Sequence, residues 1–154
     1  MFLLCAASLL REPILYLSLY FKTHRRLYYE LLDRVRTEGD WEGWLEFFLE
    51  GVRETADQAA ATARRIVDLF SADGRRIAGL GRASASVRRI HEFLQTNPIC
   101  SIPGAADKLG ISAPTVAKSF AHMQKLGTLR EITGKRRRRL FAYDRYLAIL
   151  NAGE

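Results

Sequence analysis

The chain has 154 residues, and 48% of them are hydrophobic, which excludes a disordered protein and leaves room for one domain or two small ones. The formal net charge of +7 is unevenly placed, because residues 1–80 hold 11 Lys/Arg and 12 Asp/Glu whereas residues 81–154 hold 13 and 5. The basic second half indicates a polyanionic partner, and a solvated basic surface is the alternative.

The two cysteines, Cys5 and Cys100, lie far apart and lack metal-ligand spacing. They predict reduced thiols in a cytoplasmic protein, with a disulfide as the alternative. Arg11, Glu12 and Pro13 divide the apolar N-terminal stretch, so neither part reaches the ~20 residues that a membrane-spanning helix needs. Because no charge precedes the first apolar run, we expect a buried helix end and no membrane contact, with a secretion signal as the alternative.

Three helices are expected in the first half of the chain. Pro13 opens the first, and the second covers residues 23–38, where apolar side chains recur at helical spacing. Gly39 ends the second helix, and Asp40 caps the third, which continues through an Ala-rich segment. Three glycines then predict a hinge near residues 72–83.

The third helix has a wide apolar face and a row of glutamates at i,i+4 spacing. The glutamates predict a solvent-exposed face or a contact with a basic neighbour, and the aromatic side chains of this half are expected in the core rather than in a ligand cage. The apolar face holds Trp41, Trp44, Leu45, Phe48, Leu49 and Val52, the acidic row holds Glu42, Glu46, Glu50 and Glu54, and the aromatic residues are Tyr16, Tyr20, Tyr28, Tyr29, Trp41 and Trp44.

The second half follows a different rhythm of short elements. Ser112 is expected to cap one helix, and Asp144 is expected to cap the last one. Two strands flank a basic turn and form a hairpin. The expected helices cover residues 86–96, 101–109, 113–126 and 144–150, and the expected strands cover residues 129–132 and 140–143.

Residues 105–116 have the arrangement of a helix-turn-helix, in which Gly110 permits the tight turn and a cap opens the second helix. With Val116, Phe120 and Met123 turned inward, the opposite face of that helix is expected to meet base edges in the major groove of DNA. The helix N-terminus can also accept a phosphate. The candidate DNA-contacting residues on this helix are Ser112, Thr115, Lys118, Ser119 and His122.

Five consecutive cations occupy the turn of the expected hairpin, where cations can grip phosphates or enter the minor groove. They are Lys135, Arg136, Arg137, Arg138 and Arg139. DNA is the expected partner, and a protein contact or a solvated surface are the alternatives. His24, His91 and His122 are isolated from one another, so no metal site is expected, and the sequence lacks a phosphate loop, a nucleophile elbow and a paired-carboxylate motif.

Parts of the sequence resemble a known family. Residues 10–18, residues 28–33 and the run Gly39-Asp40-Trp41-Glu42-Gly43-Trp44 are similar to the C-terminal stretch of Fic family proteins. Residues 126–135 resemble the winged helix that many bacterial Fic proteins carry after their catalytic domain. The resemblance extends over nearly the whole chain.

The resemblance implies a protein that transfers AMP from ATP to a hydroxyl group of a target protein. In the family, a His-Pro-Phe loop upstream of the region around Arg11 carries the catalytic base and holds the phosphates and the metal. No residue here matches that loop, so no catalytic residue is carried over, and ATP and Mg²⁺ are implied only for the full-length family. Residues 1–10 would correspond to the helix end that follows the loop.

We therefore expect a mostly α chain, with the helical C-terminal part of a Fic-like domain over residues 1–80 and a winged helix-turn-helix with a small β-hairpin wing over residues 84–150. The expected function is a DNA-binding regulatory module without an AMP-transferase site of its own. The alternatives are a part of a protein adenylyltransferase that needs an upstream catalytic segment, or a protein-interaction module.

Overall fold

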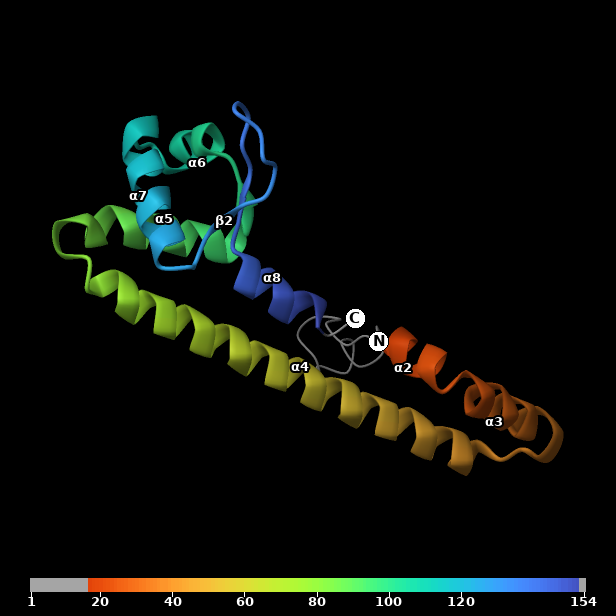
Figure 1. Cartoon of the computed structure of the whole chain (residues 1–154). Coiled ribbons are helices and arrows are strands. Elements are labelled where there is room, and N and C mark those ends of the chain that lie inside the picture. Colours follow the sequence, from red (N-terminus) through yellow and green to blue (C-terminus); the bar gives the residue numbers. More distant parts are fainter. Residues whose placement is uncertain (1–16, 153–154) are drawn as a thin grey trace. The chain divides into compact units, whose positions relative to one another are not determined.

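The computed structural model describes residues 17–152 and shows a mostly helical chain with a small three-stranded antiparallel sheet (Figure 1). The chain divides into two compact units, the first ending at Ala63 and the second spanning Arg64–Ala152. One long helix, α4 (Trp41–Ala78), contributes residues to both units. The helix start expected at Pro13 lies outside the described residues.

The first unit contains α2 (Leu17–Thr23), α3 (Arg25–Glu38) and the beginning of α4. The helix expected over residues 23–38 is confirmed as α3. Gly39 ends α3 with a left-handed φ of 71°, a conformation that glycine adopts without a steric penalty. The expected cap of α4 is also confirmed, because the Oδ1 atom of Asp40 accepts a hydrogen bond of 3.0 Å from the backbone N–H of Gly43.

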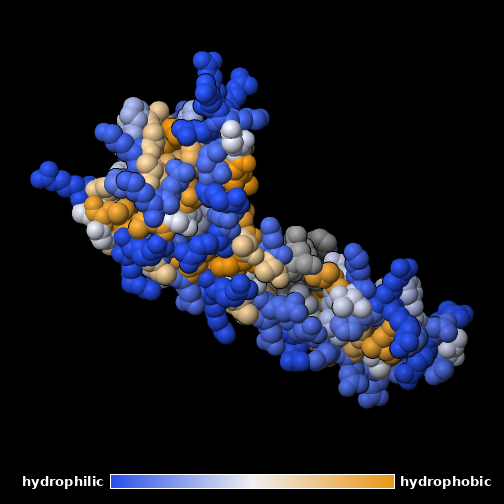
Figure 2. Space-filling model, viewed as in Figure 1, coloured by the Kyte–Doolittle hydropathy of each residue, from blue (hydrophilic) through white to orange (hydrophobic). Residues whose placement is uncertain are grey.

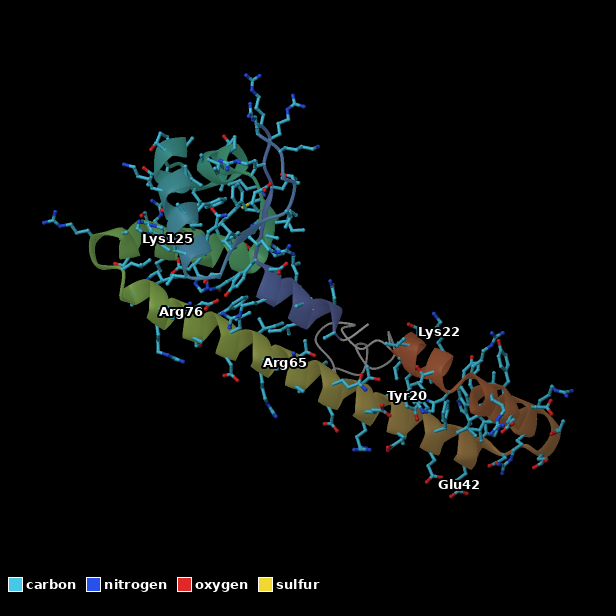
Figure 3. All side chains as sticks on the ribbon, in the orientation of Figure 1. Tyr20, Lys22, Glu42, Arg65, Arg76 and Lys125 are labelled. Carbon is cyan, nitrogen blue, oxygen red and sulfur yellow. The ribbon has the colours of Figure 1, made fainter. Side chains whose placement is uncertain are left out.

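An aromatic cluster forms the core of the first unit. Phe47 is only 7% exposed, and its ring centroid lies 5.2 Å from that of Tyr20 and 5.9 Å from that of Phe21. Tyr20, labelled in Figure 3, packs against α4 at Gly51, where a Cβ atom would lie 2.6 Å from the Tyr20 ring. The buried side of α4 therefore follows Phe47, Gly51 and Thr55 at i,i+4 spacing.

This packing corrects the expectation that all the aromatic residues of the first half are buried. Tyr29 is 56% exposed and Trp41 is 60% exposed. Trp41 lies on the side of α4 that is turned away from Phe47, because the two positions are six residues apart on a helix of 3.6 residues per turn. The expected burial of these two side chains is wrong.

The second unit contains the last part of α4 and the remaining elements. These are η1 (Gly81–Ala83), α5 (Ser84–Thr96), β1 (Ile99–Cys100), α6 (Ile102–Leu109), α7 (Ala113–Lys125), β2 (Arg130–Glu131), β3 (Phe141–Ala142) and α8 (Asp144–Asn151). Helices expected in this half match α5 to α8 within a few residues. Their buried side chains form one core that includes Ile77, Val87, Ile90, Leu94, Val116, Phe120, Met123, Phe141 and Tyr143.

The hinge expected over residues 72–83 is wrong for its first half, because α4 continues through Gly74 to Ala78. Leu69, Asp73 and Ile77 are buried at i,i+4 spacing. Their packing outweighs the ~1 kcal/mol that a glycine costs inside a helix. The break falls at residues 79–83, and the boundary between units lies after Ala63 instead of near residue 80.

The sheet has the strand order β1-β3-β2, and both pairings are antiparallel. The expected hairpin is confirmed as β2 and β3, with Arg130 opposite Ala142. Strand β1 was not predicted from the sequence. The expected cap at Asp144 is wrong, because Tyr143 takes the N-cap position, and the Asp144 carboxylate accepts hydrogen bonds of 2.7 and 3.1 Å from Arg130.

Candidate nucleic-acid interface

The turn between α6 and α7 has the local features that the sequence predicts. Gly110 ends α6 with a left-handed φ of 62°. The Ser112 hydroxyl oxygen caps α7 by accepting a hydrogen bond of 3.4 Å from the backbone N–H of Thr115. The hydroxyls of Ser112 and Thr115 also share a hydrogen bond of 2.8 Å. These two side chains fix the start of α7, and their bonding capacity is partly used within the turn.

Helix α7 is held on one side by the core of the second unit. Val116, Phe120 and Met123 are at most 1% exposed, and the Phe120 ring contacts Phe141 of β3 with 4.9 Å between centroids. Two arginines hold the C-terminal ends of the helix pair, since Arg89 donates a 2.9 Å hydrogen bond to the carbonyl of Leu109 and Arg76 donates one to the carbonyl of Leu126. The opposite face of α7 is thereby kept at the surface in a fixed orientation.

The candidate residues on α7 divide into three groups. Lys118 is exposed and forms no ion pair with residues 17–152, so it is free to contact a ligand. Thr115 and His122 are half-buried and reach the surface with part of their side chains. Ser119 is only 2% exposed, and its hydroxyl donates a 3.2 Å hydrogen bond to Ser86 of α5. The expectation that Ser119 contacts bases is therefore wrong.

Other residues share the exposed face of α7 with Lys118. Ala121 and Lys125 follow it at i+3 and i+7, and Gln124 lies beside them. Figure 3 labels Lys125 at the C-terminal end of this helix. Counting from Lys118 at helical spacing would have found Ala121 and Lys125 in the sequence.

The hairpin between β2 and β3 carries the five cations, which we call the basic loop (residues 135–139). All five are exposed, and Figure 2 shows long hydrophilic side chains projecting from this loop at the top of the molecule. In Figure 1 the loop tip lies at the same end of the second unit as α6 and the beginning of α7. The guanidinium of Arg139 lies 5.5 Å from the centroid of the Phe141 ring, and Arg138 has a left-handed φ of 54°.

The Glu131 carboxylate fixes the base of this hairpin. It accepts hydrogen bonds from the backbone N–H groups of Thr133, at 2.8 Å, and Gly134, at 3.0 Å, and another from the Thr133 hydroxyl. The pKa of Glu131 is lowered mainly by the hydrogen bond from the Thr133 side chain. Ile132 donates a 2.9 Å backbone hydrogen bond to Leu140, which closes the two strands below the cations.

A buried polar network joins α4, α5 and the start of α8 inside the second unit. Asp73 is fully buried and accepts a 2.8 Å hydrogen bond from the Tyr143 hydroxyl and one of 3.1 Å from each of Arg76 and Arg145. The Nε2 atom of His91 lies 3.3 Å from the Tyr143 oxygen, which can accept its hydrogen. Burial lowers the pKa of His91, whereas burial, followed by the bond to Asp73, raises the pKa of Tyr143.

Within residues 17–152, no group of three or more His, Cys, Asp or Glu side chains is arranged to hold a metal ion. Cys100 is free and buried, and burial raises the pKa of its thiol to about 11, so the thiol stays protonated at neutral pH. Cys5 lies outside the described residues. None of the helices within that range combines the length and the apolar character needed to cross a membrane.

The comparison with protein-family models finds no match for this chain.

Proposed function

We propose that the second unit is a winged helix-turn-helix that binds double-stranded DNA, with α7 in the major groove and the basic loop on the adjacent backbone or minor groove. The element order supports this assignment, because a helix and a short strand precede the helix-turn-helix and a two-stranded hairpin follows it. A single α-helix fits the width of the major groove. The hairpin is attached to α7 through the Phe120–Phe141 contact.

The exposed basic loop is the single observation that carries the proposal. Five cations stand in one exposed turn, and the whole second unit contains 17 Lys/Arg against 6 Asp/Glu, a net charge of +11. Cations that are not compensated within the protein are the groups that replace the counterions of the DNA backbone. Lys118 and Lys125 extend the positive charge along α7.

The exposed face of α7 is suited to base edges. Lys118 is long enough to reach guanine, and Gln124 can donate and accept hydrogen bonds. Ala121 leaves room for close approach and can contact a thymine methyl group. Thr115 and His122 reach the surface beside them, whereas Ser119 serves the packing of α7 on α5.

For the first unit, we propose a correspondence to the helical C-terminal part of a Fic-like domain, on the strength of the Gly39-to-Trp44 sequence run. The proposed role of the chain is then regulatory, because no residue of the sequence matches the catalytic His-Pro-Phe loop on which AMP transfer depends in the family. Incubation of the chain alone with labelled ATP and Mg²⁺ tests this role, and we expect no labelled protein. Measurable AMP transfer by the chain alone would contradict it.

The DNA-binding proposal is tested by fluorescence anisotropy with a labelled 30-base-pair duplex. If the protein contacts four or more phosphates, its affinity for the duplex should fall by about 100-fold or more as the salt concentration rises from 50 to 200 mM. Affinity that does not change with salt, or absence of binding at 50 mM salt, would refute the proposal. The same titration with single-stranded and double-stranded probes shows whether the duplex is preferred.

A further inference from the structure

We propose that the start of α4, in the first unit, is a docking surface for an amphipathic helix of a partner protein that carries Lys or Arg along one edge. Three large apolar side chains, Trp41, Leu45 and Leu49, recur at i,i+4 spacing and are 60%, 52% and 60% exposed. Side chains at this spacing form a continuous row along a helix. Such a row on a protein surface is typical of helix-in-groove recognition.

The apolar row borders an open groove of ≈ 820 Å³. Leu45 and Leu49 line it together with Glu42, Glu46, Glu50 and Arg53. The glutamates thus form one edge of the apolar row, at the i+1 position after each apolar residue. In Figure 3, Glu42 points outward from α4, away from α2 and α3. A partner helix seated on the row would place one of its own edges against these carboxylates.

The charges of this edge are only partly compensated within the described residues. Glu50 forms an ion pair of 2.5 Å with Arg53, and the hydrogen bond from Arg53 lowers the pKa of Glu50. Glu42 and Glu46 form no ion pair with any residue from 17 to 152. Residues 17–63 as a whole contain 6 Lys/Arg and 9 Asp/Glu. The complementary partner is therefore basic.

A second copy of the chain does not satisfy this surface. If two copies paired antiparallel along the apolar row, the glutamate edge of one copy would face the glutamate edge of the other, and like charges oppose such a contact. A parallel pair would leave the same glutamates without cations. Charge complementarity thus selects a basic helix from another polypeptide over self-association.

The test uses the full chain and two synthetic 21-residue amphipathic peptides that share one leucine ridge and carry either lysine or glutamate along its edge. Fluorescence anisotropy at 150 mM salt gives the two affinities. We expect the lysine peptide to bind about tenfold or more tightly than the glutamate peptide, although the whole chain has a net charge of +7. The L45S/L49S variant should lose about tenfold or more in affinity for the lysine peptide.

The charge-reversal variant E42K/E46K should invert the preference between the two peptides. The control V67S changes an apolar residue of α4 that is 61% exposed and lies outside this groove, and it should leave both affinities unchanged. Equal binding of the two peptides, or lysine-peptide binding that survives L45S/L49S, overturns the proposal. A wild-type dimer in sedimentation that L45S/L49S dissociates overturns it as well, because the occupant is then a second copy. None of these three outcomes bears on DNA binding by the second unit.

Discussion

The contribution of the basic loop to DNA binding can be worked out from its charges. Each phosphate contact contributes about 0.9 to the slope of log affinity against log salt. Removal of three cations from residues 136–138 therefore lowers the slope by about 2.7 if all three contact phosphates, which is about 500-fold in affinity at 0.1 M salt. Contact by only two of the three gives about 60-fold.

The variant is designed to preserve the loop conformation. Arg136 and Arg137 are replaced by Ser, whereas Arg138 is replaced by Asn, because its backbone has a left-handed φ of 54° that Asn tolerates better than most residues. The matched control K22S/R25S/R26S also removes three positive charges, but from exposed positions in the first unit. Both variants lower the net charge from +7 to +4.

Anisotropy titrations of the 30-base-pair duplex at four salt concentrations measure both the affinity and the slope. We expect a lower affinity and a smaller salt slope in the loop variant, and unchanged values of both in the control. If the loop and control variants weaken binding equally, the effect comes from net charge, and the basic loop is not a specific DNA-contacting surface. An unchanged slope in the loop variant would show that residues 136–138 do not contact phosphates.

Three further predictions concern the second unit. S119A should lower the free energy of unfolding by about 1 kcal/mol and leave DNA affinity unchanged. K118A should leave stability unchanged and weaken DNA binding by about fivefold or more, because a specific contact to a base is worth about 1–3 kcal/mol. The reverse pattern would restore Ser119 as a contact residue. Y143F should lower the free energy of unfolding in urea by about 1–3 kcal/mol, because it removes the hydrogen bond to the Oδ2 atom of the buried Asp73. A loss below about 0.5 kcal/mol would contradict this role. Burial lowers the pKa of His91, so folding favours the neutral form of its side chain. The stability that this preference contributes is present above the ordinary pKa of 6.5 and is lost as the pH falls below that value. The Tm should therefore decline from about pH 7.5 to about pH 5, and H91Q should flatten that decline.

The helices of the second unit were predictable because each has local signals. Ser112 and Gly110 mark helix ends through their own backbone and side-chain preferences, and these signals act within a few residues. Strand β1 had no such signal, since its two residues pair with β3 some 40 positions further along the chain. A strand of two residues that depends on a distant partner leaves too short a pattern for detection.

Two of the three wrong expectations about side-chain burial, those for Ser119 and Trp41, have a common physical cause. Ser119 lies between Val116 and Met123 at i+3 and i−4, so its position predicts burial although its polar side chain is typical of a surface. Trp41 is the opposite case, since an aromatic side chain suggested the core but its position faces away from Phe47. In both cases the helical position decided the burial, because a rigid helix turns a whole face toward the core regardless of one side chain.

The continuous α4 shows why the boundary between the units could not be found from the sequence. Gly74 and Gly79 lower helix propensity locally, and a boundary near residue 80 follows from that property alone. The decisive interaction is the hydrogen bond from Tyr143 to Asp73, which joins residues 70 positions apart inside the core. A cut at residue 84 would remove that acceptor together with the fully buried Ile77, and would expose the core side chains that pack with Ile77. The last turns of α4 thus belong to the proposed DNA-binding unit, because they complete the core on which α7 is held.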